Sequence, residues 1–205
     1  MTKEMDITTK TQSESQIDIE KIYRYLKKHL DAKRYEHTLG VAYTAASLAM
    51  CYGENIEDAK IAGLLHDCVK CMPNDKKFRK CKKYNVTLTE VEHDNPFLIH
   101  GKLGAFMAKH KFGVQNPDIM NAISYHTTGR PEMSTLEKII YIADYIEPNR
   151  NQIPKLDTIR KAAYKDLDET IVMILRNTLS YLEDSHAVID PMSQKTYDYY
   201  SHIVS

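Results

Sequence analysis

Apolar residues recur at helical spacing along most of this chain of 205 residues. Ile19, Ile22 and Leu26 lie on one face of a first predicted helix, and comparable patterns continue to residue 184. No segment shows the sustained alternation of apolar and polar residues, bounded by turn residues, that is typical of a strand. The sequence therefore predicts an all-α fold. At this length we expect one domain that buries about 70% of its unfolded surface.

Capping residues divide this pattern into separate helices. Gly53 is expected to end a second helix, and Asn55 to cap a third that carries the pair His66-Asp67. Ser134 and Glu137 have the S-x-x-E spacing of a capping box, which predicts the start of another helix. Pro148 is expected to stop that helix, because proline cannot continue one.

Prolines mark further boundaries. A charged helix is predicted after Pro73. Asn95-Pro96 and Asn116-Pro117 each place Asn at an N-cap and Pro at the first helical position, so each pair is predicted to open a helix. Two more helical patterns lie within residues 157–166 and 168–184, before a tyrosine-rich end.

Charge and hydropathy exclude several classes of partner. Lys plus Arg and Asp plus Glu both total 28, so no overall field attracts the chain to nucleic acid or to an anionic membrane. No window approaches the 18 apolar residues of a membrane span, and the N-terminus lacks the apolar part of a secretory signal. A cytoplasmic protein is therefore expected. Residues 1–16 are polar and predict a disordered tail, followed by a single domain over 17–205.

Six His and Asp residues fall at inward-facing positions of five predicted helices. They are His37, His66, Asp67, His100, His126 and Asp144. One such residue alone is typical of a core side chain that a backbone carbonyl satisfies. Six together need common partners, because burying an unpaired charge costs several kcal/mol. Neutral imidazole and carboxylate are ligands for zinc, iron and manganese, so the sequence predicts a shared metal site.

Two other motifs contain similar residue types. The second His-Asp pair, His93-Asp94, directly precedes Asn95-Pro96 and is interpreted as part of a solvated loop. Cys68 and Cys71 form a C-x-x-C, but a structural zinc needs four ligands and Cys81 supplies only a third sulfur. Reduced, unligated thiols are the expected state, and a zinc or redox role is the alternative.

Several segments together resemble the HD-domain metal-dependent phosphohydrolases. The segments are "RYEHTLGVA" at 34–42, "HDCVK" at 66–70, "HGKLGA" at 100–105, "YHTTGRPEMSTLEKIIYIADYIEPNR" at 125–150 and "RNTLSYL" at 176–182. The order H…HD…D is common to the superfamily. "YHTTGRP" and "ADYIEPNR" resemble one bacterial branch, the YqeK-like hydrolases, which split diadenosine tetraphosphate symmetrically. Matching pieces cover about residues 20 to 200.

The resemblance implies a role for each of the six inward-facing residues. The positions that match ligands of a first metal are His37, His66, Asp67 and Asp144. His100 and His126 match positions that hold either a second metal or the phosphates facing it, and the residues alone leave both roles open. Asp67, His100 and His126 are thereby the candidate catalytic residues. Iron is the metal that the family implies, and the ligand types equally allow manganese or zinc.

The resemblance also implies a substrate site and a reaction. The candidate substrate-binding residues are Arg34, Lys70, His100, His126, Thr127 and Arg150. Arg34 and Arg150 flank metal-bearing positions, where a guanidinium can offer a planar fork to phosphoryl oxygens. Surface salt bridges are the alternative role for these two arginines. The implied reaction is attack of a metal-bound water on a dinucleoside polyphosphate, with ADP as product, in a protein that forms a homodimer.

Basic residues are concentrated in one segment of the chain, between Lys70 and Lys83. The run between Lys70 and Lys83 contains one acid, Asp75, and is interpreted as a solvated helix face, with a patch that binds nucleic acid or steers nucleotides as the alternative. One rival function is an HD phosphohydrolase of another nucleotide, against which the two branch motifs argue. The other is a non-catalytic nucleotide sensor, which would not need the complete set of ligand residues.

Overall fold

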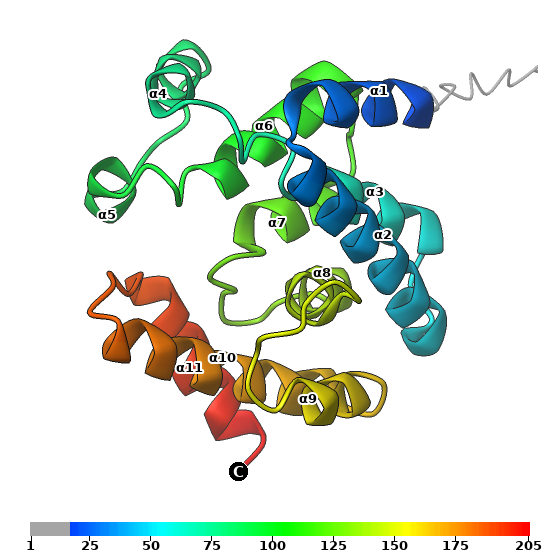
Figure 1. The fold of residues 1–205 in the computed structure, drawn as a ribbon, viewed down its shortest axis with the longest axis vertical. Coiled ribbons are helices and arrows are strands. Elements are labelled where there is room, and N and C mark those ends of the chain that lie inside the picture. The colour runs from blue at the N-terminus through cyan, green and yellow to red at the C-terminus, as the bar shows by residue number, and fades with distance from the viewer. Residues whose placement is uncertain (1–16) are drawn as a thin grey trace, which may run out of the picture.

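The computed structural model describes residues 17–205, which form eleven helices (Figure 1). Their bounds are α1 Ile19–His29, α2 Ala32–Tyr52, α3 Ile56–Leu65, α4 Asn74–Lys83, α5 Glu90–Asp94, α6 His100–Phe112, α7 Pro117–Tyr125, α8 Thr135–Ile146, α9 Leu156–Ala163, α10 Leu167–Asp184 and α11 Pro191–Ile203. Over this range no strand is present, which confirms the predicted all-α class. The predicted tail at residues 1–16 lies outside the described residues. None of the eleven helices is both long and apolar enough to cross a membrane.

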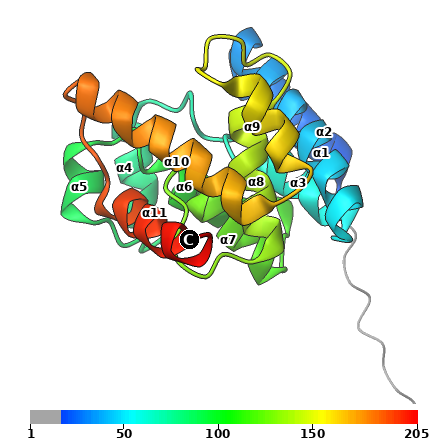
Figure 2. The same cartoon turned by 90° about the horizontal axis from the view of Figure 1, so that it is seen from below.

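Helices α2, α3, α7 and α8 form the centre of the bundle. α2 packs against α3 and α8, and α7 packs against α3, α6 and α8. On the other side of α8, α10 packs against α8, α9 and α11 (Figure 2). Leu48, Leu64, Ile123 and Ile139 are fully buried where the central helices meet.

A glycine allows α2 and α3 to approach closely. A Cβ atom on Gly63 would lie 2.7 Å from the Cα atom of Ala42, closer than real Cβ contacts come. Neither backbone could accept that contact without moving, so the absence of a side chain at residue 63 sets the separation of the two helices. This separation matters because α2 carries His37 and α3 ends beside His66.

Local sequence signals account for most helix ends. Gly53 closes α2 in the left-handed conformation at φ +71°, and the Asn55 side chain accepts hydrogen bonds at the start of α3. Asn116 caps α7, and Ser134 forms the predicted capping box of α8. α8 ends two residues before Pro148. These predicted boundaries are confirmed.

The boundary predicted at Asn95-Pro96 is wrong. α6 begins at His100, and Asn95 instead ends the short helix Glu90–Asp94. A capping box at Thr89 opens that helix, so the chain reaches Pro96 while leaving one helix rather than entering another. His93-Asp94 consequently lies in a helical turn rather than a loop, with both side chains well exposed as expected.

The predicted solvated face of the basic run is correct only in part. The run includes α4, in which Lys76 and Lys82 are exposed but Lys77 and Cys81 are buried. Residues four apart lie on the same side of a helix, so Lys77 and Cys81 together form the face by which α4 packs on the protein. Burial lowers the pKa of Lys77 below its usual value.

Candidate metal centre

The six predicted His and Asp residues lie together at the ends and faces of five helices. His37 is on α2 and Asp144 on α8, whereas His100 is the first residue of α6. His66 and His126 are the C-cap residues of α3 and α7. The predicted placement of His66-Asp67 within the third helix is therefore slightly wrong. α3 ends at Leu65, and Asp67 lies in the turn that follows, where its carboxylate can leave the helix surface.

Each of the four imidazoles is oriented by a hydrogen bond from Nδ1. In His66, His100 and His126, Nδ1 lies 2.5–2.7 Å from the backbone carbonyl oxygen of the third residue before it. In His37, Nδ1 lies 3.1 Å from Oε1 of Glu147. All four acceptors are oxygens, so each Nδ1 carries the proton and donates it. Each Nε2 therefore presents its lone pair to the site, which is the state that binds a metal.

Asp67 lies between two pairs of imidazoles and offers one oxygen to each pair. Its Oδ2 is 3.5 Å from Nε2 of His66 and 3.9 Å from Nε2 of His37. Its Oδ1 is 3.2 Å from Nε2 of His100 and 3.6 Å from Nε2 of His126. Ligands around a single ion, each bonded at about 2.0–2.2 Å, have similar separations. The carboxylate would thus contribute one oxygen to each of two cation sites.

Asp144 belongs with the first pair of imidazoles. Its Oδ1 is 3.0 Å from Nε2 of His37 and 4.0 Å from Nε2 of His66. Donor atoms of His37, His66 and Asp67 also lie within 4.8 Å of one another. The structure therefore brings together two nitrogen and two oxygen donors. They belong to the four residues that the resemblance predicted as ligands of a first metal.

The second pair of imidazoles forms a smaller group. Nε2 of His100 and Nε2 of His126 are only 3.0 Å apart, and both carry lone pairs because their protons are on Nδ1. Lys70 Nζ lies 2.9 Å from Nε2 of His100, and Thr127 Oγ1 lies 3.2–3.3 Å from both rings. Two facing lone pairs repel each other unless a cation or a donor lies between them. A second metal ion fits this requirement, whereas phosphate oxygens, which accept hydrogen bonds, would need these rings to carry a proton on Nε2 as well.

Unpartnered atoms show that the site fits a metal. His37 Nε2, His66 Nε2 and Asp67 Oδ1 are buried without a hydrogen-bond partner. The neighbours of these atoms are mainly other acceptors, which cannot donate to them. Buried polar atoms without partners are uncommon in folded proteins and are costly. A divalent cation would bind all three at once, and imidazole nitrogen with carboxylate oxygen is a suitable donor set for one.

The charges of the site favour its metal-binding state. Burial by itself would raise the pKa of Asp67, but the surrounding imidazoles, His66 first among them, hold it well below its usual value. Burial opposes the charged form of Asp144 too, and His37, His66 and Arg150 hold its pKa well below normal. Burial lowers the pKa of His100 well below its usual value. Anionic carboxylates and a neutral imidazole are the ligand forms that metals need.

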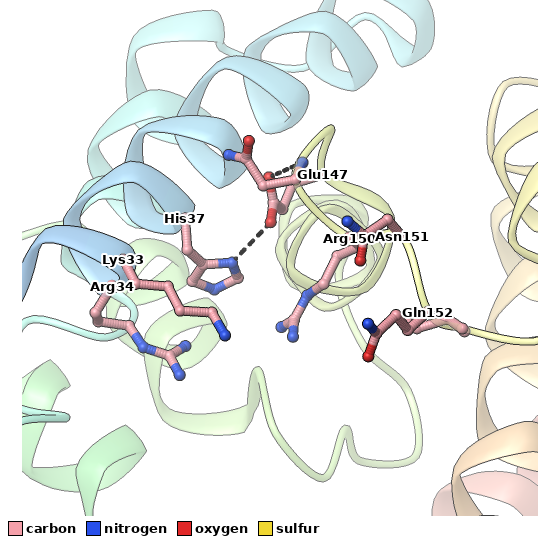
Figure 3. Close-up of a pocket in the computed structure, with 9 residues that line it drawn as sticks. Lys33, Arg34, His37, Glu147, Arg150, Asn151 and Gln152 are labelled. Carbon is pink, nitrogen blue, oxygen red and sulfur yellow. Dashed lines mark hydrogen bonds and ion pairs between the residues drawn. The ribbon is translucent and has the colours of Figure 1, made fainter.

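Arg34 and Arg150 pair with aspartates of the site rather than with surface acids. Arg34 Nη1 is 2.7 Å from Asp67 Oδ2, and Arg150 Nη2 is 2.8 Å from Asp144 Oδ1. Both side chains are about one-third exposed and line a cavity of about 430 Å³ that also includes Lys33. Figure 3 shows the two guanidinium groups reaching into this cavity from opposite sides. The cavity is thus a cationic entrance to the His and Asp cluster.

Glu147 is a site residue that the sequence analysis missed. Its carboxylate is buried, with Oε1 bound to His37 Nδ1 and Oε2 accepting the backbone N–H of Asn149 at 2.7 Å (Figure 3). Glu147 lies within the segment "ADYIEPNR" and three residues after Asp144. The sequence did contain one signal for this role, which is an acidic residue directly before Pro148, at the predicted end of the helix that carries Asp144. Its burial depends on the distance between α2 and the end of α8, which the sequence does not specify.

Comparisons with known proteins agree with this geometry. The family model described as HD domain matches residues 34–149. The chain is similar to proteins described as symmetrical bis(5'-nucleosyl)-tetraphosphatase. It is 38% identical to the one from Bacillus subtilis, over 85% of this chain and 92% of the relative, and 36% identical to the one from Staphylococcus aureus, over 91% and 96%. A crystal structure from Clostridium acetobutylicum, described as a predicted HD superfamily hydrolase involved in NAD metabolism, superposes with TM-score 0.87 and 42% identity, covering 91% of this chain and 98% of the other.

The hydrogen bond between Glu147 and His37 gives a testable prediction. Glu147→Gln keeps the shape of the side chain but removes the negative charge that strengthens the His37 ligand. We expect metal affinity to fall about 10- to 100-fold, as is usual for loss of such an outer partner. Competition with a chelator measures the change. Glu36→Gln, at an exposed position next to His37, is the matched control and should leave affinity unchanged. Equal affinities in the two variants would show that Glu147 has no part in the site.

Proposed function

Because the chain belongs to the HD-domain family, we propose that it hydrolyses diadenosine tetraphosphate symmetrically to two ADP. The observation that carries this proposal is the buried cluster of four imidazoles around the Asp67 carboxylate. It lies within a chain that is 36–38% identical to symmetrical bis(5'-nucleosyl)-tetraphosphatases over most of its length. Those relatives are named for this reaction, and the chain retains the donors that a metal-dependent phosphohydrolase needs.

The cluster divides into two ligand groups in this proposal. His37, His66, Asp67 and Asp144 would hold the first ion. Asp67, His100 and His126 would hold a second ion, or would contact the phosphates opposite the first. A bound divalent metal supplies Lewis acidity and lowers the pKa of a coordinated water toward neutrality. Iron is the metal we propose, on the family resemblance, and the donor set equally suits manganese or zinc.

Cationic side chains on both sides of Asp67 support a central position for the reacting phosphorus. Arg34 binds the Oδ2 side of the carboxylate at 2.7 Å, and Lys70 Nζ lies 3.8 Å from the Oδ1 side. A chain of phosphates lying across Asp67 would meet a cation on each side, with Arg150 beyond the first and Thr127 beyond the second. The bridge between the two middle phosphates would then lie nearest the metal ligands. In-line displacement at that bridge separates two equal halves.

The remaining parts of the proposal concern the setting of the enzyme. We propose one domain over residues 17–205 that acts in the cytoplasm, where a nucleotide substrate occurs. A homodimer is proposed on the family resemblance alone, and sedimentation of the purified protein tests it. Nucleic acid is not proposed as a partner, because acidic and basic residues balance.

Substitution of Asp67 tests the site itself. Asp67→Ala removes the carboxylate whose oxygens lie within 4 Å of both groups of imidazoles, so we expect loss of bound metal and of all measurable hydrolysis. The matched control is Asp94→Ala, in the exposed second His-Asp pair, which should retain metal and full activity. Metal analysis and turnover of both variants provide the measurement. Full metal content with full turnover in Asp67→Ala would disprove the HD mechanism.

Substitution of Arg150 separates substrate binding from metal binding. Arg150→Ala should retain the metal but lose about 10- to 100-fold in kcat/KM, the effect of losing one charge-assisted hydrogen bond to phosphate. Arg24→Ala, on the exposed side of α1, is the control and should match the parent. If Arg150→Ala turned over normally, Arg150 would be only the ion-pair partner of Asp144.

The position of the cut is tested with water labelled with heavy oxygen. Attack at the central bridge places the label in ADP, and no AMP or ATP forms. Mass analysis of the products from diadenosine tetraphosphate gives the answer directly. AMP with ATP would disprove symmetrical cleavage while leaving the metal site intact. Absence of turnover with any nucleotide in a metal-loaded protein would favour the sensor, and faster hydrolysis of another nucleotide would favour a different HD phosphohydrolase.

A further inference from the structure

A second cavity lies behind the turn that carries Asp67. It has a volume of about 410 Å³ and is enclosed by α1, residues 68–73, α4 and α6. Figure 1 shows these three helices at the same end of the molecule, away from α9, α10 and α11. Cys68 and Val69 form part of its wall, and both directly follow Asp67 along the chain. The volume is within the range of small-molecule sites.

Positive charge is concentrated around this cavity. Its cationic lining residues are Lys28, Lys76, Lys80 and Lys111. Among residues 17–205 no acidic side chain lines it, although the whole chain contains as many acids as bases. A carboxylate near the rim, that of Asp31, already accepts hydrogen bonds from Arg34 N and Cys71 Sγ. Like charges around one hollow repel each other, and an anionic ligand would remove that repulsion.

The lining beneath these cations is aromatic and apolar. Tyr25, Val69 and Met107 are buried and line the cavity. Lys111 Nζ lies 4.7 Å from the centre of the Tyr25 ring, which holds that lysine at the edge of the apolar surface. Lys80 Nζ similarly lies 4.0 Å from the sulfur of Met107. The exposed imidazole of His29 stacks on the Tyr25 ring with 4.0 Å between ring centres, so His29 and the Met107 thioether form a flat, apolar surface beside the lysines. Such a lining suits a ligand that has both a flat apolar part and phosphates.

We propose that this cavity is a second ligand site, which binds a phosphorylated molecule of nucleotide size. Lys76, Lys80 and Lys111 hold its phosphates, and its base lies against His29 and Met107. The site differs from the metal centre, because Asp67 directs its side chain to the imidazoles while Cys68 and Val69 face this cavity. It also explains the basic run of α4, which neither the metal centre nor its entrance uses. The proposal does not depend on which nucleotide the metal centre hydrolyses.

Methionine methyl groups allow the two sites to be distinguished by NMR. Met72 and Met107 line the second cavity, whereas none of the methionines that the structure describes lines the cavity beside Arg150. The full chain labelled at its methionine methyls is titrated with ADP, and the same titration is repeated in Arg150→Ala. We expect the Met72 and Met107 signals to shift and saturate in both proteins. Adenosine, which has no phosphate, should leave both signals in place.

A triple variant provides the second arm of the test. Lys76→Ala with Lys80→Ala and Lys111→Ala should weaken the ADP-dependent shifts at least about tenfold, since three cation–phosphate contacts are lost. The control removes three exposed lysines far from the cavity and should bind ADP like the parent. Its substitutions are Lys161→Ala, Lys165→Ala and Lys195→Ala. Far-UV circular dichroism checks that both variants remain folded.

Four outcomes would overturn the proposal. Unchanged Met72 and Met107 signals at saturating ADP would show that the cavity binds no nucleotide. Shifts that disappear in Arg150→Ala would show that ADP acts only from the metal centre. Equal binding in the triple variant and its control would exclude the three lysines. Equal shifts with inorganic tripolyphosphate would show that the base is not recognised.

Discussion

The buried carboxylate of Asp67 is the group on which the rest of the centre depends. A single carboxylate held at 1% exposure is costly unless partners surround it, and the four imidazoles, Arg34 and Lys70 do so. Those partners come from α2, α6, α7 and the end of α3, so the carboxylate can be satisfied only when these helices meet correctly. The close approach of α2 and α3 at Gly63 is one condition for that meeting. The helix packing that forms the fold is therefore the same packing that surrounds the Asp67 carboxylate with its partners.

Backbone carbonyls at or next to helix ends orient three of the four imidazoles. His66 and His126 follow the last turns of α3 and α7, where backbone carbonyls lack partners within the helix, and each ring donates to such a carbonyl. His100 Nδ1 donates an equivalent hydrogen bond to the carbonyl oxygen of Phe97, in the turn before α6. His37 lies inside α2, where carbonyls are already bonded within the helix. It therefore needs a carboxylate from elsewhere, which explains why Glu147 is buried beside it.

The sequence was informative where the physical cause is local. Gly53, Asn55, Asn116 and the box at Ser134 act within one turn of backbone, and the helix ends they predicted are correct. Asn95-Pro96 failed because the stronger cap at Thr89 lies six residues earlier and determines the local helix. Periodicity also indicated which His and Asp residues face inward. It did not indicate that Asp67 divides its oxygens between two groups or that Glu147 is buried, because both depend on contacts between distant segments.

The charges of the centre finally connect its architecture to its substrate. Asp67, Asp144 and Glu147 are balanced by Arg34, Arg150 and Lys70, so the ligand groups and their paired cations are neutral as a set before any ion binds. Each divalent ion then adds positive charge that no further carboxylate of this set neutralises. An anionic chain of phosphates can do so, and it can reach the ions through the entrance beside the two arginines. Metal binding would thereby create the attraction for a polyphosphate, and a carboxylate added near this entrance would weaken it. The same balance favours substrates with several phosphates over those with one, since only the former match the charge that the ions introduce.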